Sequence, residues 1–110
     1  RIVYGARKRN FEVSLGEKKE AKDWLYDLLY VKQDCRCALS NLPIRISNTI
    51  KGDMKCETTA SLDRIDSKKG YTKDNVQWVH KWVNKMKLHL DQDEFIMFCE
   101  AIAKHKGKLK

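Results

Sequence analysis

The sequence contains neither the long apolar run of a membrane protein nor the leader pattern of a secreted one. No segment of its 110 residues approaches the roughly 20 consecutive apolar residues that a membrane-spanning helix requires. The N-terminal residues show no succession of basic, apolar and small side chains of the kind that marks a signal peptide. We therefore expect no membrane partner.

The sequence also contains few cysteines and a single proline, and each observation limits the possible folds. The four cysteines, Cys35, Cys37, Cys56 and Cys99, form no C-x2-C pair. A disulfide scaffold of this length would be richer in cysteine and poorer in helical patterns, so we expect reduced thiols in a cytoplasmic protein. The single proline, Pro43, argues against a central strand at its position.

Acidic residues are outnumbered by basic ones. Asp and Glu total 15 against 23 Lys and Arg, which gives a net charge of +8, and 42% of the residues are hydrophobic. This apolar share suffices for one modest core, so residues 1–110 are expected to form a single domain. The basic surplus indicates a phosphate-rich partner or an anionic membrane surface, and solubility alone is the alternative explanation.

Apolar residues at helical spacing predict a helix on each side of the central region. Ser14 and Glu17 fit a capping box that opens a helix over residues 15–32. Its apolar stripe consists of Ala21, Trp24, Leu25, Leu28 and Leu29. A last helix begins at Asp91, where acidic residues favour the first turn. Its buried stripe is predicted to be Phe95, Phe98, Cys99 and Ile102.

Between these helices the sequence predicts short strands and one further helix. Two strand pieces within residues 35–46 flank a turn at Ser40 and Asn41, because Asn tolerates the left-handed conformation. Residues 58–66 and 76–79 predict an antiparallel hairpin with a long connection. A helical period then begins at Val79. The polar face of that helix, expected to meet substrate, consists of His80, Asn84 and Lys87.

The N-terminal segment combines a short strand pattern at residues 11–13 with a basic cluster, Arg7, Lys8 and Arg9. This cluster is either a set of phosphate contacts near a groove or a solvated charged run near a chain end. The basic tail from Lys104 onward poses the same alternative.

Residues 61–87 gather the polar side chains best suited to chemistry. Asp63 lies on the first hairpin strand, Asn75 in the connection, and Asn84 on the helix that follows, so this unit can bring them together. Asp63 and Asn84 offer a charged and a neutral oxygen, which suit a hard cation that keeps several waters. A single cation can neutralise a phosphodiester and stabilise the leaving oxygen during hydrolysis.

In this stretch the chain resembles the HNH endonuclease superfamily, the ββα-metal or His-Me finger nucleases, and is most similar to the small phage-type and intron-type members. Asp63-Arg64 stands where the family has Asp-His. Asn75 matches the central Asn, and Asn84 matches the last His or Asn on the helix. The resemblance is strongest over residues 61–87 and extends more loosely over most of the chain.

The resemblance implies an α+β fold with a ββα-metal core over about residues 58–90 and flanking helices. It implies a metal-dependent DNA endonuclease that acts by water attack and leaves a 5′-phosphate and a 3′-hydroxyl. Asp63 and Asn84 would hold one divalent ion, Mg²⁺ or Mn²⁺, and Asn75 would set the loop geometry. The residues expected to contact nucleic acid are Arg64, Lys85 and Lys87. A bacterial or phage-infected cytoplasm is expected, and a homodimer or two nicking events would cut both strands.

Arg64 departs from the family pattern, because the family uses the His at this position as the general base. An arginine cannot accept a proton near neutral pH, although it can bind the scissile phosphate or stabilise developing charge. The candidates for the missing base are His80, Tyr71, Tyr26 and Tyr30. We select His80, for which a structural position packed near Cys37 is the alternative.

Many family members brace this fold with zinc bound to two cysteine pairs. The matching positions here are Cys37, Ser40, His80 and Val83, so at least half of the ligands are replaced, and Cys35 or Cys56 would have to compensate. We therefore do not expect structural zinc. Two rival functions stay open: an inactive DNA-binding module derived from the nuclease, and a zinc-braced nucleic-acid-binding domain.

Overall fold

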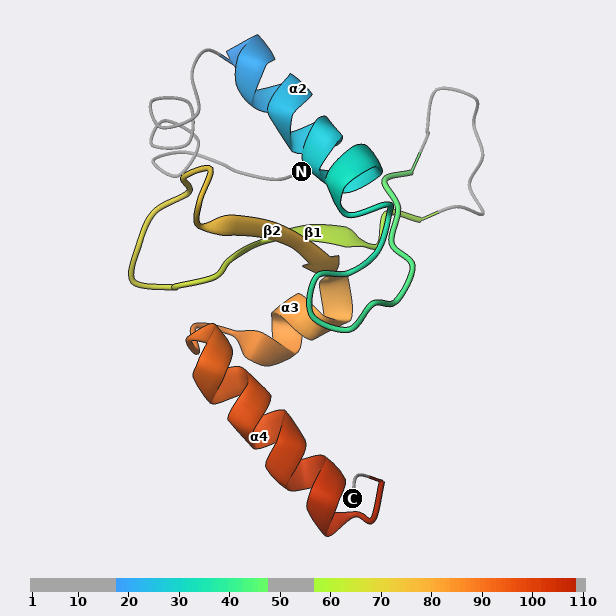
Figure 1. The fold of residues 1–110 in the computed structure, drawn as a ribbon, viewed down its shortest axis with the longest axis vertical. Coiled ribbons are helices and arrows are strands. Elements are labelled where there is room, and N and C mark those ends of the chain that lie inside the picture. The colour runs from blue at the N-terminus through green and yellow to red at the C-terminus, as the bar shows by residue number, and fades with distance from the viewer. Residues whose placement is uncertain (1–17, 48–56, 109–110) are drawn as a thin grey trace.

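The structure, a computed structural model, describes residues 18–47 and 57–108. Its elements in chain order are helix α2 (Lys18–Asp27), the π-helical turn η1 (Leu28–Lys32), strands β1 (Ala60–Arg64) and β2 (Val76–His80), and helices α3 (Lys81–Lys87) and α4 (Gln92–His105). They form a small α+β domain with a two-stranded antiparallel sheet. Figure 1 shows α2 and α3 on opposite sides of this sheet, with α4 extending away from it.

The predicted hairpin is confirmed. Ala60 pairs with His80 and Arg64 pairs with Val76, so the two strands are fully in register. β1 is shorter than the predicted range 58–66, because Thr59 instead exchanges hydrogen bonds with Arg45 in the preceding segment. Successive side chains of β1 point to opposite faces of the sheet, one toward α2 and one toward α3. The face toward α2 packs in the core, and the face toward α3 carries the polar side chains.

The predicted first helix is confirmed over the described residues, as α2 followed by η1. Ala21, Leu25 and Leu29 are buried, as their spacing predicts. The last turn is π-helical rather than α-helical, and Gln33 N–H closes it by donating to the carbonyl of Leu28 at 2.8 Å. The predicted capping box and residues 15–17 lie outside the described residues.

Trp78 joins the hairpin to the first helix. Its indole Nε1–H donates to the carbonyl of Leu25 at 2.9 Å, and the side chain is 1% exposed. The amide side chain of Gln33 binds the backbone N–H and carbonyl of Trp78 at 2.9 and 2.8 Å. These contacts anchor β2 to the first helix, so the sheet face toward α3 has a fixed position relative to the core.

Residues 35–46 form a loop rather than the two predicted strand pieces. Only an isolated bridge between Arg36 and Pro43 is present among these residues. Proline has no N–H to extend a ladder, which explains why the pairing stops there. Asn41 has φ 63°, the left-handed conformation expected for an Asn at this turn.

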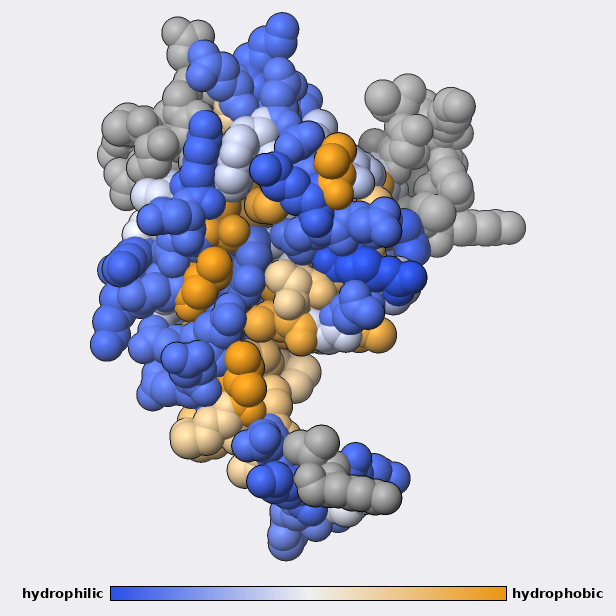
Figure 2. All heavy atoms as spheres, in the orientation of Figure 1, coloured by the Kyte–Doolittle hydropathy of each residue, from blue (hydrophilic) through white to orange (hydrophobic). Residues whose placement is uncertain are grey.

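The predicted buried stripe on α4 is wrong beyond its first turn. Phe95 is 7% exposed, but Phe98 and Ile102 are 50% and 63% exposed, and Cys99 is half-buried. The reason is that α4 diverges from the rest of the domain (Figure 1), so an open groove separates Cys99 and Ala103 from Leu39, Val83 and Met86. In Figure 2 hydrophobic side chains accordingly reach the surface over α3 and the first turns of α4.

Some expectations fall on residues that are not described. These are the strand pattern at residues 11–13, the basic cluster Arg7, Lys8 and Arg9, and Cys56. Among the described residues, Cys35, Cys37 and Cys99 are not joined in disulfides. Within ranges 18–47 and 57–108, no helix combines the length and apolar character that crossing a membrane requires.

Candidate metal and nucleic-acid site

Asp63 lies on the α3 side of the sheet and is 5% exposed. Its Oδ2 accepts a hydrogen bond from Gln77 Nε2, directly across the hairpin, at 3.0 Å. The ammonium of Lys87 lies 3.0 Å from Oδ1 and 2.9 Å from Oδ2. Because a carboxylate offers about four acceptor positions, one position on Oδ1 is left for a further ligand.

Lys87 was expected to contact phosphate, and the structure corrects this expectation. Its side chain is 1% exposed, and its Nζ also donates to the carbonyl of Arg64 at 2.6 Å. α3 packs on β1, so its last residue brings the ammonium onto the carboxylate of Asp63 rather than to the surface. Lys87 therefore neutralises Asp63 and ties α3 to β1.

Asn84 lies on α3 one turn before Lys87. Its Nδ2 donates to Ser61 Oγ at 2.7 Å and to the carbonyl of Leu62 at 3.5 Å. These bonds fix the orientation of the side-chain amide, and they leave its carbonyl oxygen as the atom available to a ligand. Asn84 therefore presents the kind of oxygen that a hard cation prefers.

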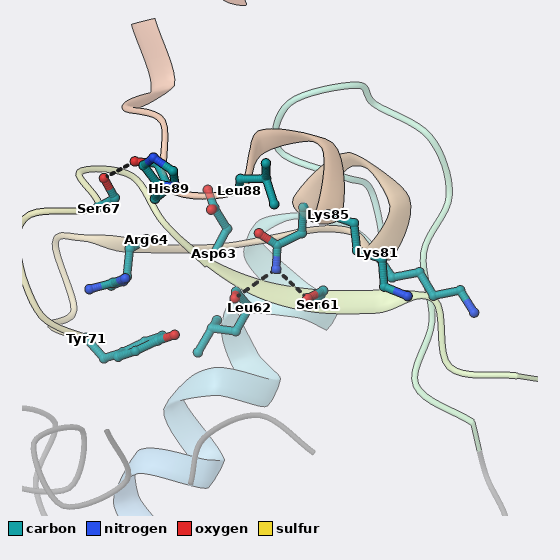
Figure 3. Close-up of a pocket in the computed structure, with 11 residues that line it drawn as sticks. Ser61, Leu62, Asp63, Arg64, Ser67, Tyr71, Lys81, Lys85, Leu88 and His89 are labelled. Atoms are coloured by element: carbon teal, nitrogen blue, oxygen red, sulfur yellow. Dashed lines mark hydrogen bonds between the residues drawn. The ribbon is translucent and has the colours of Figure 1, made fainter. Parts of the chain in front are cut away.

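Asp63 and Asn84 line one open cleft of about 520 Å³ (Figure 3). β1, α3 and the segments next to them form its walls. The charged and titratable side chains that also line it are Arg64, Tyr71, Lys81, Lys85 and His89. The two residues predicted as metal ligands thus line the same cleft, together with several cationic side chains.

Arg64 reaches this cleft because it is the last residue of β1. Neighbours on a regular strand point to opposite faces, so Asp63 and Arg64 can share a site only where the strand ends. The guanidinium donates to the carbonyl of Lys69 at 3.1 Å and lies 5.3 Å from the ring centroid of Tyr71. Both contacts hold it at the edge of the cleft (Figure 3).

Asn75 holds the connection between the two strands. Its Oδ1 accepts from the backbone N–H of Asp66 at 2.8 Å. Its Nδ2 donates to the carbonyls of Asp66 at 3.0 Å and of Gly70 at 2.8 Å. The side chain is 5% exposed, so it acts within the loop and not on a substrate. This is the loop-setting contact that the family resemblance implies for this position.

His80 does not take the position that helical spacing predicts. It is the N-cap of α3 with φ −65° and ψ 139°, so it precedes the helix and does not share a face with Asn84. Its Nδ1 accepts from the backbone N–H of Trp82 at 3.2 Å. Of the tyrosine candidates, Tyr71 lines the cleft, whereas Tyr26 and Tyr30 contact each other on the first helix and lie outside it.

Two lysines flank an exposed tryptophan next to the cleft. Trp82 is 57% exposed, and the Nζ atoms of Lys85 and Lys81 lie 4.6 and 5.8 Å from its ring centroid. Lys81 also pairs with the Glu57 carboxylate at 2.8 Å, and this hydrogen bond and charge lower the pKa of Glu57. Both lysines also line the cleft, so their positive charges lie beside Asp63 and Asn84 as well as beside Trp82.

The positions that correspond to the family's zinc ligands have other contacts here. Sγ of Cys37 accepts from the backbone N–H of Ser40 at 3.3 Å. Burial raises the pKa of this thiol, but hydrogen bonds from Ser40, His80 and Leu39 outweigh burial, so the pKa lies below its ordinary value. Across the described part of the chain, no three His, Cys, Asp or Glu side chains gather as metal ligands.

The donor atoms that Asp63 and Asn84 offer are of the type that suits a divalent cation, and both residues line the same open cleft. Both residues present oxygen, the donor type that Mg²⁺ and Mn²⁺ prefer, and the open cleft leaves the other coordination positions to water and phosphate. An ion held by Asp63 would have to share this carboxylate with the ammonium of Lys87.

Sequence reasoning missed three residues that shape this site. Gln77 and Ser61 bind Asp63 and Asn84, and His89 lines the cleft. The strand register contains a signal for Gln77 and Ser61, because both occupy the sheet face of Asp63. His89 lies in the turn after α3, where no periodicity indicates its direction.

Comparisons with protein-family models, curated proteins and solved structures find no match to this chain. The choice of function therefore depends on the residues of the cleft and on the motif resemblance.

Proposed function

We propose that the chain is a metal-dependent DNA endonuclease of the HNH type, with β1, β2 and α3 as its ββα-metal core. One observation carries the proposal: Asp63 and Asn84, from a strand and a helix, line the same cleft as cationic side chains. The cations nearest to them in the sequence are Arg64 and Lys85. A cation site formed by the oxygens of Asp63 and Asn84 and surrounded by positive side chains suits an anionic phosphodiester. The phosphodiester can place its oxygens on the cation and on the positive side chains.

Asp63 and Asn84 would hold one Mg²⁺ or Mn²⁺ ion, which would supply positive charge to neutralise the scissile phosphate and the leaving oxygen. Arg64 binds a phosphate oxygen from the edge of the cleft, where its contact with Tyr71 orients it. A water oxygen attacks phosphorus and loses a proton to a base, while the bond to the 3′-oxygen breaks. The 3′-oxygen takes up a proton from solvent, which gives a 3′-hydroxyl and a 5′-phosphate.

The exposed residues of α3 form the nucleic-acid-binding surface. Lys81 and Lys85 neutralise phosphates, and Trp82 offers an aromatic surface between them on which a base can stack. The net charge of +8 supplies a further attraction that does not depend on sequence.

A second candidate function is supported by the contact between Lys87 and Asp63. An ammonium already neutralises the carboxylate, so a module that binds DNA without cutting it would need no metal at this site. In that case Arg64 and Lys85 bind phosphate, and Asp63 is a structural residue.

Cleavage of supercoiled plasmid with Mg²⁺, Mn²⁺, Zn²⁺ or EDTA distinguishes these candidates. The variants are Asp63→Asn and Asn84→Ala, with Asp93→Asn on the exposed side of α4 as the control. Asp63→Asn is used instead of Asp63→Ala because asparagine retains an oxygen that can accept from the buried ammonium of Lys87. Since the negative charge is lost in this variant, circular dichroism must first establish that it folds.

The nuclease proposal expects metal-dependent nicking by the wild type and by Asp93→Asn. The nicking rate is expected to fall at least about 100-fold in Asp63→Asn and Asn84→Ala, because a bound metal lowers the activation free energy by several kcal/mol. DNA binding, measured by fluorescence anisotropy in EDTA, should be nearly unchanged. Tight DNA binding without cleavage under any of the metals would establish the second candidate instead.

A further inference from the structure

The proposed reaction needs a base for the attacking water, and the cleft contains one suitable side chain. The chain has three histidines, and all three are among the described residues. His80 caps α3 through its ring, and His105 is the last residue of α4. His89 alone of the three lines the cleft with Asp63 and Asn84.

The backbone around His89 is held in an unusual conformation. Leu88 has φ 53° and ψ −123°, and the N–H of Leu90 donates to the carbonyl of Lys87 at 3.1 Å. These values describe a type II′ turn with leucine at its first central position, where glycine is the preferred residue. Strained positions of this kind concentrate at functional sites, because the surrounding structure must maintain them.

A side chain from the hairpin connection holds the same turn. The hydroxyl of Ser67 donates to the carbonyl of His89 at 2.6 Å, and Ser67 also lies 3.4 Å from Oδ1 of Asp91. Figure 3 shows His89, Ser67 and Asp63 at the same end of the cleft. The backbone of His89 is thus fixed at the cleft while its side chain is exposed to the solvent that supplies the attacking water.

The other titratable groups of the cleft are unsuited to this role. Asp63 is neutralised by Lys87, and Arg64 cannot lose a proton near neutral pH. Lys81 and Lys85 are cations, and the phenol of Tyr71 is a poor acceptor until it ionises. Histidine is the side chain that accepts and releases protons near neutral pH.

We propose that His89 is the general base of this nuclease, in place of the histidine that Arg64 replaces; this inference rests on the proposed function. The imidazole removes a proton from the water as its oxygen forms the bond to phosphorus. The electron pair of the breaking P–O bond stays on the 3′-oxygen, which is protonated by solvent. The imidazolium then returns its proton to solvent.

Three substitutions test the assignment on supercoiled plasmid with Mg²⁺ or Mn²⁺. His89→Gln should lower the cleavage rate at least about 100-fold, the usual contribution of a general base. His80→Asn, which retains a capping acceptor, and His105→Gln are matched controls and should cleave nearly as the wild type does. The acidic limb of the pH–rate profile should disappear in His89→Gln, and imidazole should restore part of the activity of His89→Gly.

A second readout needs neither metal nor turnover. Modification of the histidines by diethyl pyrocarbonate in EDTA is followed by mass spectrometry, with and without a duplex oligonucleotide. The duplex should protect His89 several-fold and leave His105 unprotected, because only His89 lies where the scissile phosphate binds.

Each outcome has a definite meaning. Wild-type cleavage with an unaffected rate in His89→Gln would overturn the assignment of the base and leave the nuclease proposal standing. Absence of cleavage by the wild type with every metal would overturn the nuclease proposal and the base together. Equal modification of His89 with and without DNA would also overturn the assignment.

Discussion

The ammonium of Lys87 lies between the two carboxylate oxygens of Asp63, at 3.0 and 2.9 Å, with both side chains at most 5% exposed. One residue comes from the end of α3 and the other from β1. A pair this buried is costly to form but more costly to break, because removal of one partner leaves an uncompensated charge. The pair therefore controls both the stability of the domain and access to the carboxylate.

Lys87→Met is expected to lower the free energy of unfolding by about 3–5 kcal/mol, because Asp63 is left buried and unpaired. Urea denaturation followed by circular dichroism measures the change. The double variant Asp63→Leu with Lys87→Met should recover most of the loss, since both charges are then absent. Lys85→Met serves as the control and should change stability by less than about 0.5 kcal/mol. A loss in the double variant as large as in Lys87→Met would contradict this explanation.

The same substitution tests whether a cation uses Asp63. In Lys87→Met the carboxylate no longer has an ammonium, so Mg²⁺ or Mn²⁺ should bind more tightly and raise the melting temperature more than in the wild type. Thermal melts with increasing metal concentration measure the difference, and Lys85→Met should respond as the wild type does. Equal metal-induced shifts in Lys87→Met and the wild type would show that the ion does not use this carboxylate.

Asn75→Ala is expected to destabilise the chain by about 3 kcal/mol, because it removes three hydrogen bonds worth roughly 1 kcal/mol each. The loss of stability should be greatest in the connection between the strands, because the N–H of Asp66 no longer has its hydrogen-bond acceptor. Hydrogen exchange of this amide should accelerate more than that of Trp78, which has separate contacts. Asp74→Ala, a change at an exposed neighbour, is the control. An equal acceleration of hydrogen exchange in both strands and in the connection would instead indicate that only global unfolding has changed.

Lys85→Met is expected to weaken DNA binding equally for all sequences and to reduce the salt dependence. The slope of log K against log salt should become less steep by about 0.9, the value for one lost phosphate contact. Lys22→Met is a matched control, because Lys22 also lies over an aromatic ring, that of Tyr26, but belongs to α2, which lies across the sheet from α3 (Figure 1). Anisotropy titrations at several salt concentrations measure the slope, and an unchanged slope in Lys85→Met would remove this residue from the interface.

The sequence predicted the hairpin and the first helix because their patterns are strong and local. Ala21, Leu25 and Leu29 repeat at helical spacing, and all three are buried. Asp63 and Asn84 meet because a hairpin followed at once by a helix folds back on itself, which follows from the order of elements.

The remaining errors arise from features that periodicity does not encode. The predicted helical face included His80 because the helix was started two residues too early, at Val79 instead of Lys81. Lys87 was expected at the surface because lysine is rarely buried, and only the tertiary contact with Asp63 reverses this preference. On α4, apolar spacing correctly indicates a helix, but it does not tell whether another element covers Phe98 and Ile102.

Leu88 is the single residue between Lys87 and His89, and its turn leaves the two neighbours little independent movement. A cation that binds Asp63 beside the ammonium of Lys87 therefore acts on a residue only two positions from His89. In thermodynamic terms, metal binding at Asp63 and protonation of His89 are coupled to the extent that each changes the position of this turn. The coupling is reciprocal: a metal ion that lowers the proton affinity of His89 by some factor is itself bound less tightly, by the same factor, when His89 is protonated.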